Sequence, residues 1–419
     1  MGVDRRRFLQ AGISLLAVSG LGACQPTSFF KPKVVVVGGG FGGVTVARYL
    51  AKWAKQDVDI TLFSDVSTYT VCPSSNLYIG DLSAAVRQMG YQELRQRGVN
   101  VRIGKVTGVD RSQQKVMLSG NQSFSYDYLV LAPGVDFLPD TKDIKASGLV
   151  IAAWRDTEEI NRLARSVHSL KHDDTVVITV PLAPYKCPSA PYERACLIAN
   201  YIQRRNINAR VIILDENRNI TSKASLFYDA FQNYYPDIID YRAESEILSI
   251  DSERNRISTA FEEIEATLIN RIPAQKAGQL LFDAGLIPEG KRWCPVDWQT
   301  MQSLGDEQVY VVGDAVESVY ALPKSAHVAN SQAKVCAAAI IRRVQGLSPF
   351  PEPIMMNCCF SHVTDQSAIH LAAVCRYDLD TERMQVIKAS HQQSDTDSEL
   401  EAIFAREWQA NILSDSFGV

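Results

Sequence analysis

The nine cysteines of this 419-residue sequence include no Cys-x-x-Cys pair, which argues against a zinc ribbon and against a thioredoxin-type motif. The haem-attachment pattern Cys-x-x-Cys-His is also absent, so any c-type haem would have to belong to another chain. There is no basic run and no acidic tail, and the net charge of −4 is mild, so we expect no nucleic-acid partner. With no metal site expected, the cysteines remain for structural thiols, long-range disulfides, covalent attachment or lipidation.

The first thirty residues have the pattern of an export signal. Arg5-Arg6-Arg7 is followed by Phe8-Leu9 and by a weakly apolar run over 11–23, which is the twin-arginine pattern. The run is too short to cross a bilayer as a helix of the mature protein. A short amphipathic helix is the competing interpretation, and the arginines directly before the run disfavour it. We therefore expect residues 1–30 to direct a folded, cofactor-loaded protein to the periplasm.

The end of this segment, Leu21-Gly22-Ala23-Cys24, also resembles a lipobox. An acylated Cys24 would tether the mature protein to a membrane surface. Ordinary cleavage near Ala23 is the alternative, and the sequence leaves both open. In either case the compartment is oxidising enough for disulfides.

A β-α-β unit with a glycine-rich turn follows. Lys33–Val37 is a β-branched run typical of a buried parallel strand, a helical stretch runs from Val44 to about Lys55, and Asp59–Phe63 predicts the next strand. Between strand and helix lie Gly38, Gly40 and Gly43 in a Gly-x-Gly-x-x-Gly spacing, the context in which this motif binds a dinucleotide pyrophosphate.

The acid that commonly binds the adenosine ribose at the end of the second strand is replaced here. Ser64 occupies that place and Asp65 follows it. Ser64 would make a single bond to the ribose, or Asp65 would reach in. The third interpretation is that neither residue contacts the ribose.

Two later motifs favour FAD over NAD. The segment Tyr126–Gly134 is a strand ending in an Ala-Pro-Gly turn, and Val309–Val312 leads into Gly313-Asp314. In this order, the motifs resemble those of two-dinucleotide flavoproteins, in which the late aspartate binds the ribityl or pyrophosphate region of FAD. The resemblance implies that Gly134, Gly313 and Asp314 bind the cofactor.

A second α/β unit has a strand at Thr175–Val180, a helix at Glu193–Arg204 and a strand at Val211–Asp215. The intervening loop, Pro181–Pro188, contains no glycine, and its prolines remove N–H donors. We therefore expect no nicotinamide site here.

The fold class expected is α/β, with two Rossmann-like dinucleotide-binding domains of the glutathione-reductase-like kind and a C-terminal interface domain. The predicted boundaries are an FAD-binding domain at 31–148 and 285–348, a second Rossmann-like domain at 149–284, and a C-terminal domain at 349–419.

The most specific string is Lys186-Cys187-Pro188-Ser189-Ala190-Pro191-Tyr192-Glu193-Arg194-Ala195. It resembles the cysteine motif of sulfide-oxidising flavoproteins, especially the flavoprotein subunit of flavocytochrome c sulfide dehydrogenase. The likeness extends over most of the chain beyond the signal. It includes Thr70-Val71-Cys72, Trp293-Cys294-Pro295-Val296-Asp297, Pro323-Lys324-Ser325, Asn330-Ser331-Gln332, Asn357-Cys358-Cys359-Phe360-Ser361 and the Ser414-to-Gly418 terminus.

The resemblance implies a redox disulfide between Cys187 and Cys359 beside the flavin. Cys358 is the alternative partner, although Cys359 precedes the aromatic-serine pair as in the family; the competing interpretation is two buried thiols. It also implies FAD bound covalently through Cys72, where Pro73 departs from the pattern. Glu193 would act as a general acid or base, or it would only bond its own helix N-terminus.

The implied reaction follows from thiol chemistry. Hydrosulfide attacks the disulfide, giving a persulfide and a thiolate, and two electrons pass to FAD. A positive neighbour favours the thiolate, and Lys186 or Arg194 would supply it. The resembled family passes the electrons to a c-type cytochrome subunit. Quinone-linked sulfide oxidation at the membrane and a flavin-bearing electron-transfer or redox-sensing subunit without sulfide turnover are the alternatives.

Overall fold

The computed structural model describes residues 31–55, 57–84, 86–139, 150–155, 157–251 and 253–419. Within it, Pro32–Val419 forms one compact unit. The predicted export signal at 1–30, with Cys24, lies outside the described residues.

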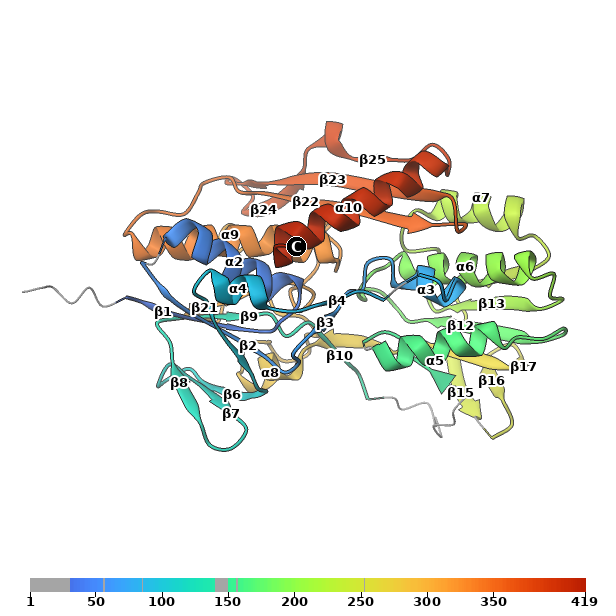
Figure 1. Cartoon of the computed structure of the whole chain (residues 1–419), viewed down its shortest axis with the longest axis horizontal. Helices are drawn as coiled ribbons and strands as arrows, with labels where there is room; N and C mark the ends of the chain where they lie inside the picture. The colour runs from blue at the N-terminus through green and yellow to red at the C-terminus, as the bar shows by residue number, and fades with distance from the viewer. Residues whose placement is uncertain (1–30, 56, 85, 140–149, 156, 252) are drawn as a thin grey trace, which may run out of the picture. The chain divides into compact units, whose positions relative to one another are not determined.

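The first domain is built on a six-stranded sheet with the order β20-β21-β9-β1-β2-β5. Its strands are β1 (Lys33–Val37), β2 (Asp59–Ser64), β5 (Asn100–Ile103), β9 (Tyr128–Leu131), β20 (Gln302–Ser303) and β21 (Asp306–Val311). The strands β21, β9, β1, β2 and β5 pair in parallel. The long helices α2 (Phe41–Ala54) and α9 (Ala326–Val344) pack against each other beside this sheet (Figure 1).

Smaller elements complete the first domain. They are β3 (Tyr69–Thr70), β4 (Gln88–Met89), α4 (Gln92–Gln96), α8 (Gln279–Asp283) and the antiparallel strands β6 (Val106–Asp110), β7 (Lys115–Leu118) and β8 (Ser123–Ser125). The segment from Val99 to Val109 forms two strands, β5 and β6, in different sheets. Gly104 separates them.

The second domain has a parallel five-stranded sheet with the order β11-β18-β12-β13-β14. Its strands are β11 (Val150–Ile151), β12 (Thr175–Val180), β13 (Arg210–Asp215), β14 (Ile239–Arg242) and β18 (Leu268–Arg271), and its helices are α3 (Ser75–Gly80), α5 (Thr157–His168), α6 (Ala190–Arg204) and α7 (Ala224–Tyr234). Strand β12 is buried at every position, as its unbroken apolar run predicts. Ile79 of α3 joins the second core, although its sequence lies within the predicted FAD-binding domain.

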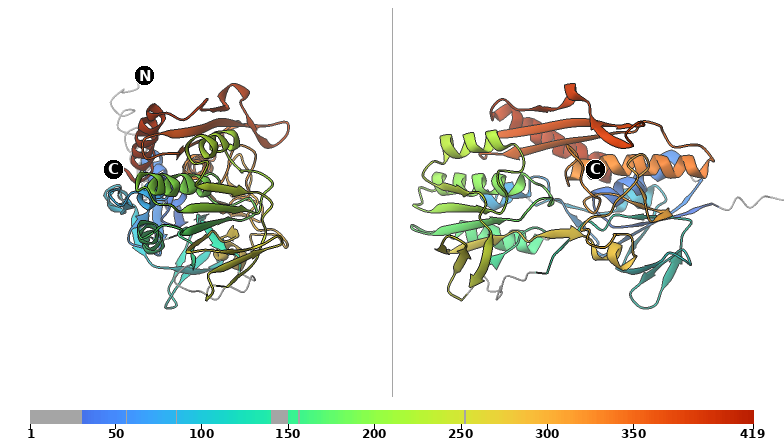
Figure 2. Two further views of the ribbon diagram at one scale, coloured as in Figure 1. Left: turned by 90° about the vertical axis from the view of Figure 1, so that its right-hand side faces the viewer. Right: turned by 180° about the vertical axis from the view of Figure 1, so that it is seen from behind.

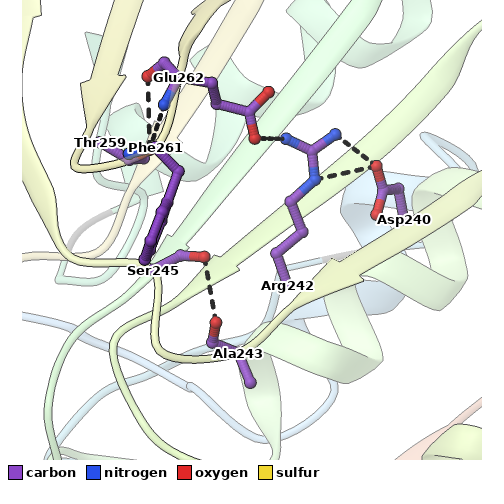
Figure 3. Close-up of polar contacts among 7 residues, drawn as sticks. All are labelled: Asp240, Arg242, Ala243, Ser245, Thr259, Phe261 and Glu262. Carbon is purple, nitrogen blue, oxygen red and sulfur yellow. Dashed lines mark hydrogen bonds and ion pairs between the residues drawn. The ribbon is translucent and has the colours of Figure 1, made fainter.

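An antiparallel sheet of β15 (Ile247–Asp251), β16 (Arg256–Thr259) and β17 (Glu263–Glu265) covers the second face of the five-stranded sheet through a core of its own. Arg242 at the end of β14 joins the two sheets, since its guanidinium binds both Asp240 and Glu262 of the β16–β17 turn (Figure 3). These groups are partly exposed, so the ion pairs contribute little free energy.

Two strands connect the domains. β10 (Val135–Phe137) pairs with β19 (Gln275–Ala277), one leaving the first domain and the other returning to it. Ala277, Leu281 and Ala284 already belong to the first core. The chain therefore returns to the first domain a few residues before the predicted boundary at 285.

The C-terminal segment forms a layer across both domains. It contains β22 (Ile354–His362), β23 (Ala368–Asp378), β24 (Arg383–Val386), η1 (Lys388–Ser390), β25 (Gln392–Gln393) and α10 (Glu399–Phe417). β22 contacts α9 of the first domain and α6 of the second, and α10 contacts α2. Figures 1 and 2 show this layer in orange and red over α9, α2 and α6. It thereby brings β22, which carries the late cysteines, against the second domain.

Candidate active site

The glycine-rich turn has the geometry of a dinucleotide loop. Gly38 directly follows β1 with φ +119°, and a Cβ on it would lie 2.1 Å from Ala132 O. A Cβ on Gly43 would lie 2.0 Å from Gly38 O. Helix α2 begins directly after Gly40, so its free N–H groups face the end of the sheet. Only glycine lets strand, turn and helix approach this closely.

The ribose position holds Ser64 at the end of β2, where it is buried. Its hydroxyl donates to Val66 O at 2.8 Å and lies 2.9 Å from the Tyr91 hydroxyl. Tyr91 in turn donates to Gly39 O at 3.2 Å. Asp65 is exposed beside it. The Ser64 hydroxyl is thus already used in bracing the glycine loop, and whether Ser64 or Asp65 binds a ribose stays a prediction.

The turn after β21 presents a carboxylate that lacks a partner. Asp314 Oδ1 is buried without a hydrogen-bond donor among the described residues. Burial raises the pKa of this carboxyl, while Lys186 and Lys324 lower it. Gly313, with φ +83°, donates its N–H to Gln332 Oε1 at 2.7 Å, which holds the turn on α9. A buried acceptor with no donor fits a ligand that brings hydroxyl groups, as the ribityl chain of FAD does.

Gly134 lies in the turn after β9, where the chain leaves the first sheet. Its φ is +69°, and a Cβ there would meet no atom within 4 Å. Its carbonyl accepts from Gly278 N at 3.0 Å, which ties the outgoing and returning connections together. The predicted cofactor-binding glycines therefore lie on one edge of the sheet, where its parallel strands end.

Cys72 lies between β3 and α3, close to this edge. Burial raises the pKa of its thiol; Asp314 also raises it, and Lys186 and a hydrogen bond from Tyr69 lower it. The Tyr69 ring stacks on Phe417 at the end of α10, with ring centroids 5.8 Å apart. Cys72 thus shares an electrostatic environment with Asp314, which suits a cysteine facing the flavin part of the cofactor. A bond to FAD is not shown by this geometry and stays a prediction.

Cys187 lies in the proline-rich loop between β12 and α6. Its N–H donates to Lys324 O at 2.8 Å, and its carbonyl accepts from Ala190 N at 2.9 Å. Burial raises the pKa of the Cys187 thiol well above its usual value, with further contributions from Cys359, Cys72 and Glu193. Cys187 therefore lies close enough to Cys72 of the first domain and Cys359 of the C-terminal layer for their charges to influence its pKa.

The structure separates Cys358 from Cys359 by strand alternation. Neighbouring residues of β22 point to opposite faces. Cys359 Sγ lies 3.3 Å from Ser189 Oγ, in the Cys187 motif, and 3.5 Å from Lys223 Nζ. Cys359 is therefore the late cysteine that faces the Cys187 loop. All eight described cysteines are free thiols, so the pairing of Cys187 with Cys359 remains a prediction.

Glu193 is buried at the start of α6 and is held at both oxygens. His362 N donates to its Oε1 at 2.8 Å, and Asn76 Nδ2 donates to its Oε2 at 2.7 Å. Burial raises the pKa of this carboxyl, and the two hydrogen bonds oppose that rise. In these contacts its oxygens make no hydrogen bond to the first turn of α6. They instead connect α6 to β22 and α3.

Two lysines that sequence reasoning did not assign lie within this cluster. Lys324 Nζ donates to Asp314 O at 2.9 Å and to Val316 O at 2.6 Å, and it lies 3.4 Å from the centroid of the Trp293 ring. Burial lowers the Lys324 pKa to about 7. Lys324 lies within the Pro323-Lys324-Ser325 string of the family resemblance, which could have pointed to it. Lys223 lies in no such motif.

The two cations proposed from the sequence are differently placed. Arg194 Nε donates to Asn76 Oδ1 at 3.0 Å and Nη1 donates to Asn270 Oδ1 at 2.8 Å, while its guanidinium covers Trp154. Lys186 Nζ donates to Trp154 O at 3.0 Å. Arg194 therefore has a structural role in joining α6 to β18. Lys186, held by Trp154 O, lowers the pKa of the Cys72 and Cys187 thiols against the effect of burial.

At the corresponding end of the second sheet, the ribose-binding position is hydrogen-bonded to other residues of the chain. Asp215 ends β13, where a nicotinamide nucleotide would bind its ribose, and it is fully buried. Tyr192 and Tyr241 hydroxyls donate to its Oδ2 at 2.6 and 3.0 Å, and Asn217 Nδ2 donates to Oδ1 at 2.7 Å. Its acceptor capacity is used internally, and Pro191 occupies the start of α6.

Two further observations concern the described part of the chain. No helix there is both long and apolar enough to cross a membrane. Nor do three or more His, Cys, Asp or Glu side chains gather there in a way that could hold a metal ion.

The fold and this site define the class first. The family model "pyridine nucleotide-disulphide oxidoreductase" matches residues 32–178. The sulfide:quinone oxidoreductase of Aquifex aeolicus superposes with a TM-score of 0.77 at 16% identity, covering 92% of each chain. The predicted α/β fold with two dinucleotide-binding domains is confirmed.

Sequence comparison narrows this class. The central-region model of the sulfide dehydrogenase (flavocytochrome c) flavoprotein chain matches residues 160–273, and the flavin-binding model of flavocytochrome c sulphide dehydrogenase matches 351–417. The flavoprotein chain of that enzyme from Chlorobaculum thiosulfatiphilum is 46% identical over 44 residues, 90% of that sequence and 10% of this one. Mitochondrial sulfide:quinone oxidoreductase of Dictyostelium discoideum is 21% identical over 332 residues, 75% of this chain and 72% of that one.

The chain belongs to the flavocytochrome c sulfide dehydrogenase flavoprotein family, which is related to the sulfide:quinone oxidoreductases. The predicted resemblance is confirmed. The family includes a flavin-binding region, and the chain's glycine loop and unpartnered Asp314 oxygen fit FAD.

Proposed function

We propose that this chain is the FAD-bearing subunit of an exported sulfide dehydrogenase, which oxidises hydrosulfide at Cys187 and Cys359 and passes the electrons to a c-type cytochrome subunit. One observation carries the proposal: the Cys359 thiol lies 3.3 Å from Ser189 in the Cys187 motif, although the two segments are far apart in sequence. Cys72 also raises the pKa of the Cys187 thiol, and Asp314 in turn raises the pKa of Cys72.

The chain's residues have distinct tasks in this reaction. Cys187 and Cys359 form a disulfide that hydrosulfide opens, leaving one cysteine as a persulfide and the other as a thiolate. FAD, held by the Gly38–Gly43 turn and Asp314, supplies a two-electron acceptor when bound. Glu193 lies beside the cysteines with a pKa raised by burial, so it exchanges a proton nearer to neutral pH than an exposed glutamate does.

The cofactor is bound through Cys72 in this proposal. Its thiol lies in the environment of Asp314 and Lys186, at the edge where the cofactor-binding turns meet. Covalent attachment would keep FAD in a protein that has left the cytoplasm, where FAD is made.

The site and the acceptor are expected outside the cytoplasm. The twin-arginine pattern in 1–30 supports export of the loaded enzyme to the periplasm, and Cys24 would add a lipid tether if it is acylated. The chain carries no haem-attachment sequence, so the cytochrome would be a separate chain.

Quinone is the second candidate acceptor, and a specific observation favours it. Both the Dictyostelium relative and the Aquifex structure are sulfide:quinone oxidoreductases by name, and each covers most of this chain. An anaerobic assay with sulfide and either cytochrome c or a soluble quinone analogue separates the two. Faster reduction of the quinone would overturn the cytochrome assignment and leave the sulfide chemistry in place.

The sulfide chemistry itself is tested by flavin absorbance. Sulfide added anaerobically to the native protein should bleach the flavin, and Cys187→Ser should slow this by at least about 100-fold, since the disulfide cannot form. Cys196→Ala, a buried cysteine of α6, is the control and should bleach like the native protein. Unchanged bleaching in Cys187→Ser would remove the cysteines from the reaction.

A further inference from the structure

The two cysteine sulfurs of the site lie in unequal surroundings. Lys223 Nζ lies 3.5 Å from Cys359 Sγ and donates to Cys359 O at 3.1 Å. Lys223 is only 4% exposed, and no carboxylate of the described residues lies within ion-pairing distance of it. A buried ammonium without a carboxylate is costly unless another anion offsets its charge. The Cys359 sulfur is placed to do so as a thiolate, beside the Glu193 carboxylate, which also interacts electrostatically with Lys223.

Ser189 adds a directed hydrogen bond to the same sulfur. Ser361 Oγ donates to Ser189 Oγ at 3.1 Å, so the Ser189 hydroxyl accepts there and its own hydrogen is left to point elsewhere. Cys359 Sγ lies 3.3 Å away. Although Ser189 is the N-cap residue of α6, its side chain makes no capping bond. Lys223 and Ser189 therefore favour the negative form of Cys359, whereas Phe360 O, 3.8 Å from the sulfur, accepts from its neutral thiol.

Cys187 lacks these neighbours. Its hydrogen bonds are made by its backbone, and no bond to its sulfur occurs within the described part of the chain. Burial and the adjacent Cys359, Cys72 and Glu193 raise the pKa of its thiol. Lys186 acts in the opposite direction, but its Nζ is bound to Trp154 O. In thiol–disulfide exchange, the sulfur that is better stabilised as a thiolate is the better leaving group.

We propose that Lys223 is a catalytic residue that, with Ser189, makes Cys359 the leaving thiolate, so that hydrosulfide attacks Cys187 and the persulfide forms there. This inference rests on the proposed sulfide chemistry and deepens it. The hydrosulfide sulfur forms a bond to Cys187 Sγ, and the Cys187–Cys359 bond breaks. The bonding pair stays on Cys359 as a thiolate beside the Lys223 ammonium. The products are a Cys187 persulfide and the Cys359 thiolate.

The first test measures Cys359 without any sulfide. In the reduced, flavin-loaded protein, alkylation of Cys359 by iodoacetamide is followed by peptide mass spectrometry across about pH 6 to 9. Lys223→Met should slow alkylation near neutral pH about tenfold, because the positive charge that favours the Cys359 thiolate is lost. Lys223→Arg should stay within about threefold of native, because it keeps the charge. Lys171→Met, on an exposed lysine, should change nothing.

The other groups that face Cys359 stay constant in this comparison. They are Cys187 in the preceding loop and Cys358 on β22; Glu193 on α6, which interacts electrostatically with Lys223, is likewise unchanged. If Lys223→Met does not fold, as judged by flavin absorbance and thermal unfolding, Ser189→Ala tests the same thiolate and should slow alkylation about threefold. An unchanged alkylation rate in the folded variants overturns the role of Lys223 and Ser189.

The second test locates the new sulfur–sulfur bond. The oxidised native protein receives one equivalent of sodium sulfide anaerobically and is then alkylated and mapped. The added sulfur should lie on Cys187, and in Lys223→Met it should be divided between Cys187 and Cys359. Added sulfur on Cys359 of the native protein overturns the inference. If no cysteine gains sulfur and the flavin is not bleached, the proposed function fails, while the alkylation test still decides the role of Lys223.

Discussion

At the scale of single residues, the backbone of Cys187 is unusual. Its φ is +56°, in the left-handed region that non-glycine residues rarely adopt. Such a conformation costs on the order of 1 kcal/mol and persists where neighbouring contacts hold it. Here the contacts are the bond from Cys187 N to Lys324 O and the start of α6. The strained residue is also one of the two cysteines proposed to react with hydrosulfide.

Cys72 gives a prediction at this scale. If FAD is bound covalently through its sulfur, acid precipitation of the native protein should leave the flavin absorbance in the pellet. In Cys72→Ala the flavin should move to the supernatant, because only non-covalent contacts then hold it. The control is Cys375→Ala, a buried cysteine of β23. Flavin released by acid from the native protein would disprove covalent attachment.

His362 gives a second prediction, on pH and stability. It is 3% exposed, and neither ring nitrogen has a hydrogen-bond partner among the described residues. Burial lowers its pKa from 6.5 to about 4. Between these values the unfolded chain binds a proton that the native protein does not, so stability falls as pH falls from about 6.5 to about 4.

The free energy lost in this way is at most on the order of 3 kcal/mol. Urea denaturation at about pH 7 and about pH 4.5 should therefore show a smaller loss of stability in His362→Leu than in the native protein. His391→Leu, at an exposed position, serves as the control. Equal losses in native protein and His362→Leu would show that His362 does not stay neutral.

At the scale of elements, helix starts position the site. Ser325 caps α9, accepting from Val328 N at 3.2 Å and donating to Asn357 Oδ1 at 3.0 Å. The next residues of the same helix hold the cofactor turn and the C-terminal helix. Gln332 accepts from Gly313 N, and Asn330 Nδ2 donates to Ser416 Oγ at 2.9 Å. The Asn330-Ser331-Gln332 string therefore connects α9 to the cofactor-binding turn and to α10.

Ser325→Ala is predicted to lower the free energy of unfolding by about 2 kcal/mol. About 1 kcal/mol comes from the lost cap, and the rest from the buried Asn357 amide, which loses a donor. Urea denaturation of the flavin-loaded protein measures it. Ser123→Ala, on exposed β8, should change stability by less than about 0.5 kcal/mol. A similar small loss in Ser325→Ala would mean that the cap is not needed.

At the scale of the whole molecule, the C-terminal layer completes the site. α10 is anchored on α2 and α9, since Thr45 of α2 donates to Ser416 at 3.1 Å and Lys334 of α9 binds Asp415 at 2.7 Å. β22 lies between α9 and α6. Because this strand carries Cys359, the proposed active site forms only when both dinucleotide domains and the C-terminal layer are folded together.

The hydrogen bonding of Asp215 in the second domain gives a prediction about which electron donor reduces the flavin. Asp215 is saturated by Tyr192, Tyr241 and Asn217, and the preceding loop lacks glycine. We expect NADH to leave the flavin absorbance unchanged over minutes, while sulfide bleaches it. Stopped-flow absorbance compares the two donors. Bleaching by NADH at a rate similar to that with sulfide would show that the second domain still binds a nicotinamide nucleotide.

Helix and strand positions follow closely from residue order, because local patterns set them. The predicted strands at Lys33–Val37 and Thr175–Val180 agree with β1 and β12 residue for residue. Helices α2 and α6 begin a few residues earlier than predicted, at Phe41 and Ala190. Glycine, proline and serine at these starts obscured the apolar period on which the predictions relied.

Residue order by itself determined the dinucleotide turns, the α/β class and the family, since each depends on short strings whose chemistry is local. Only the tertiary structure decided which side chains meet. It turned Cys359, and not Cys358, toward the Cys187 loop through the alternation of β22, and it brought Lys223 to that sulfur from a loop without any motif. Long-range packing sets such contacts, and no local pattern encodes them.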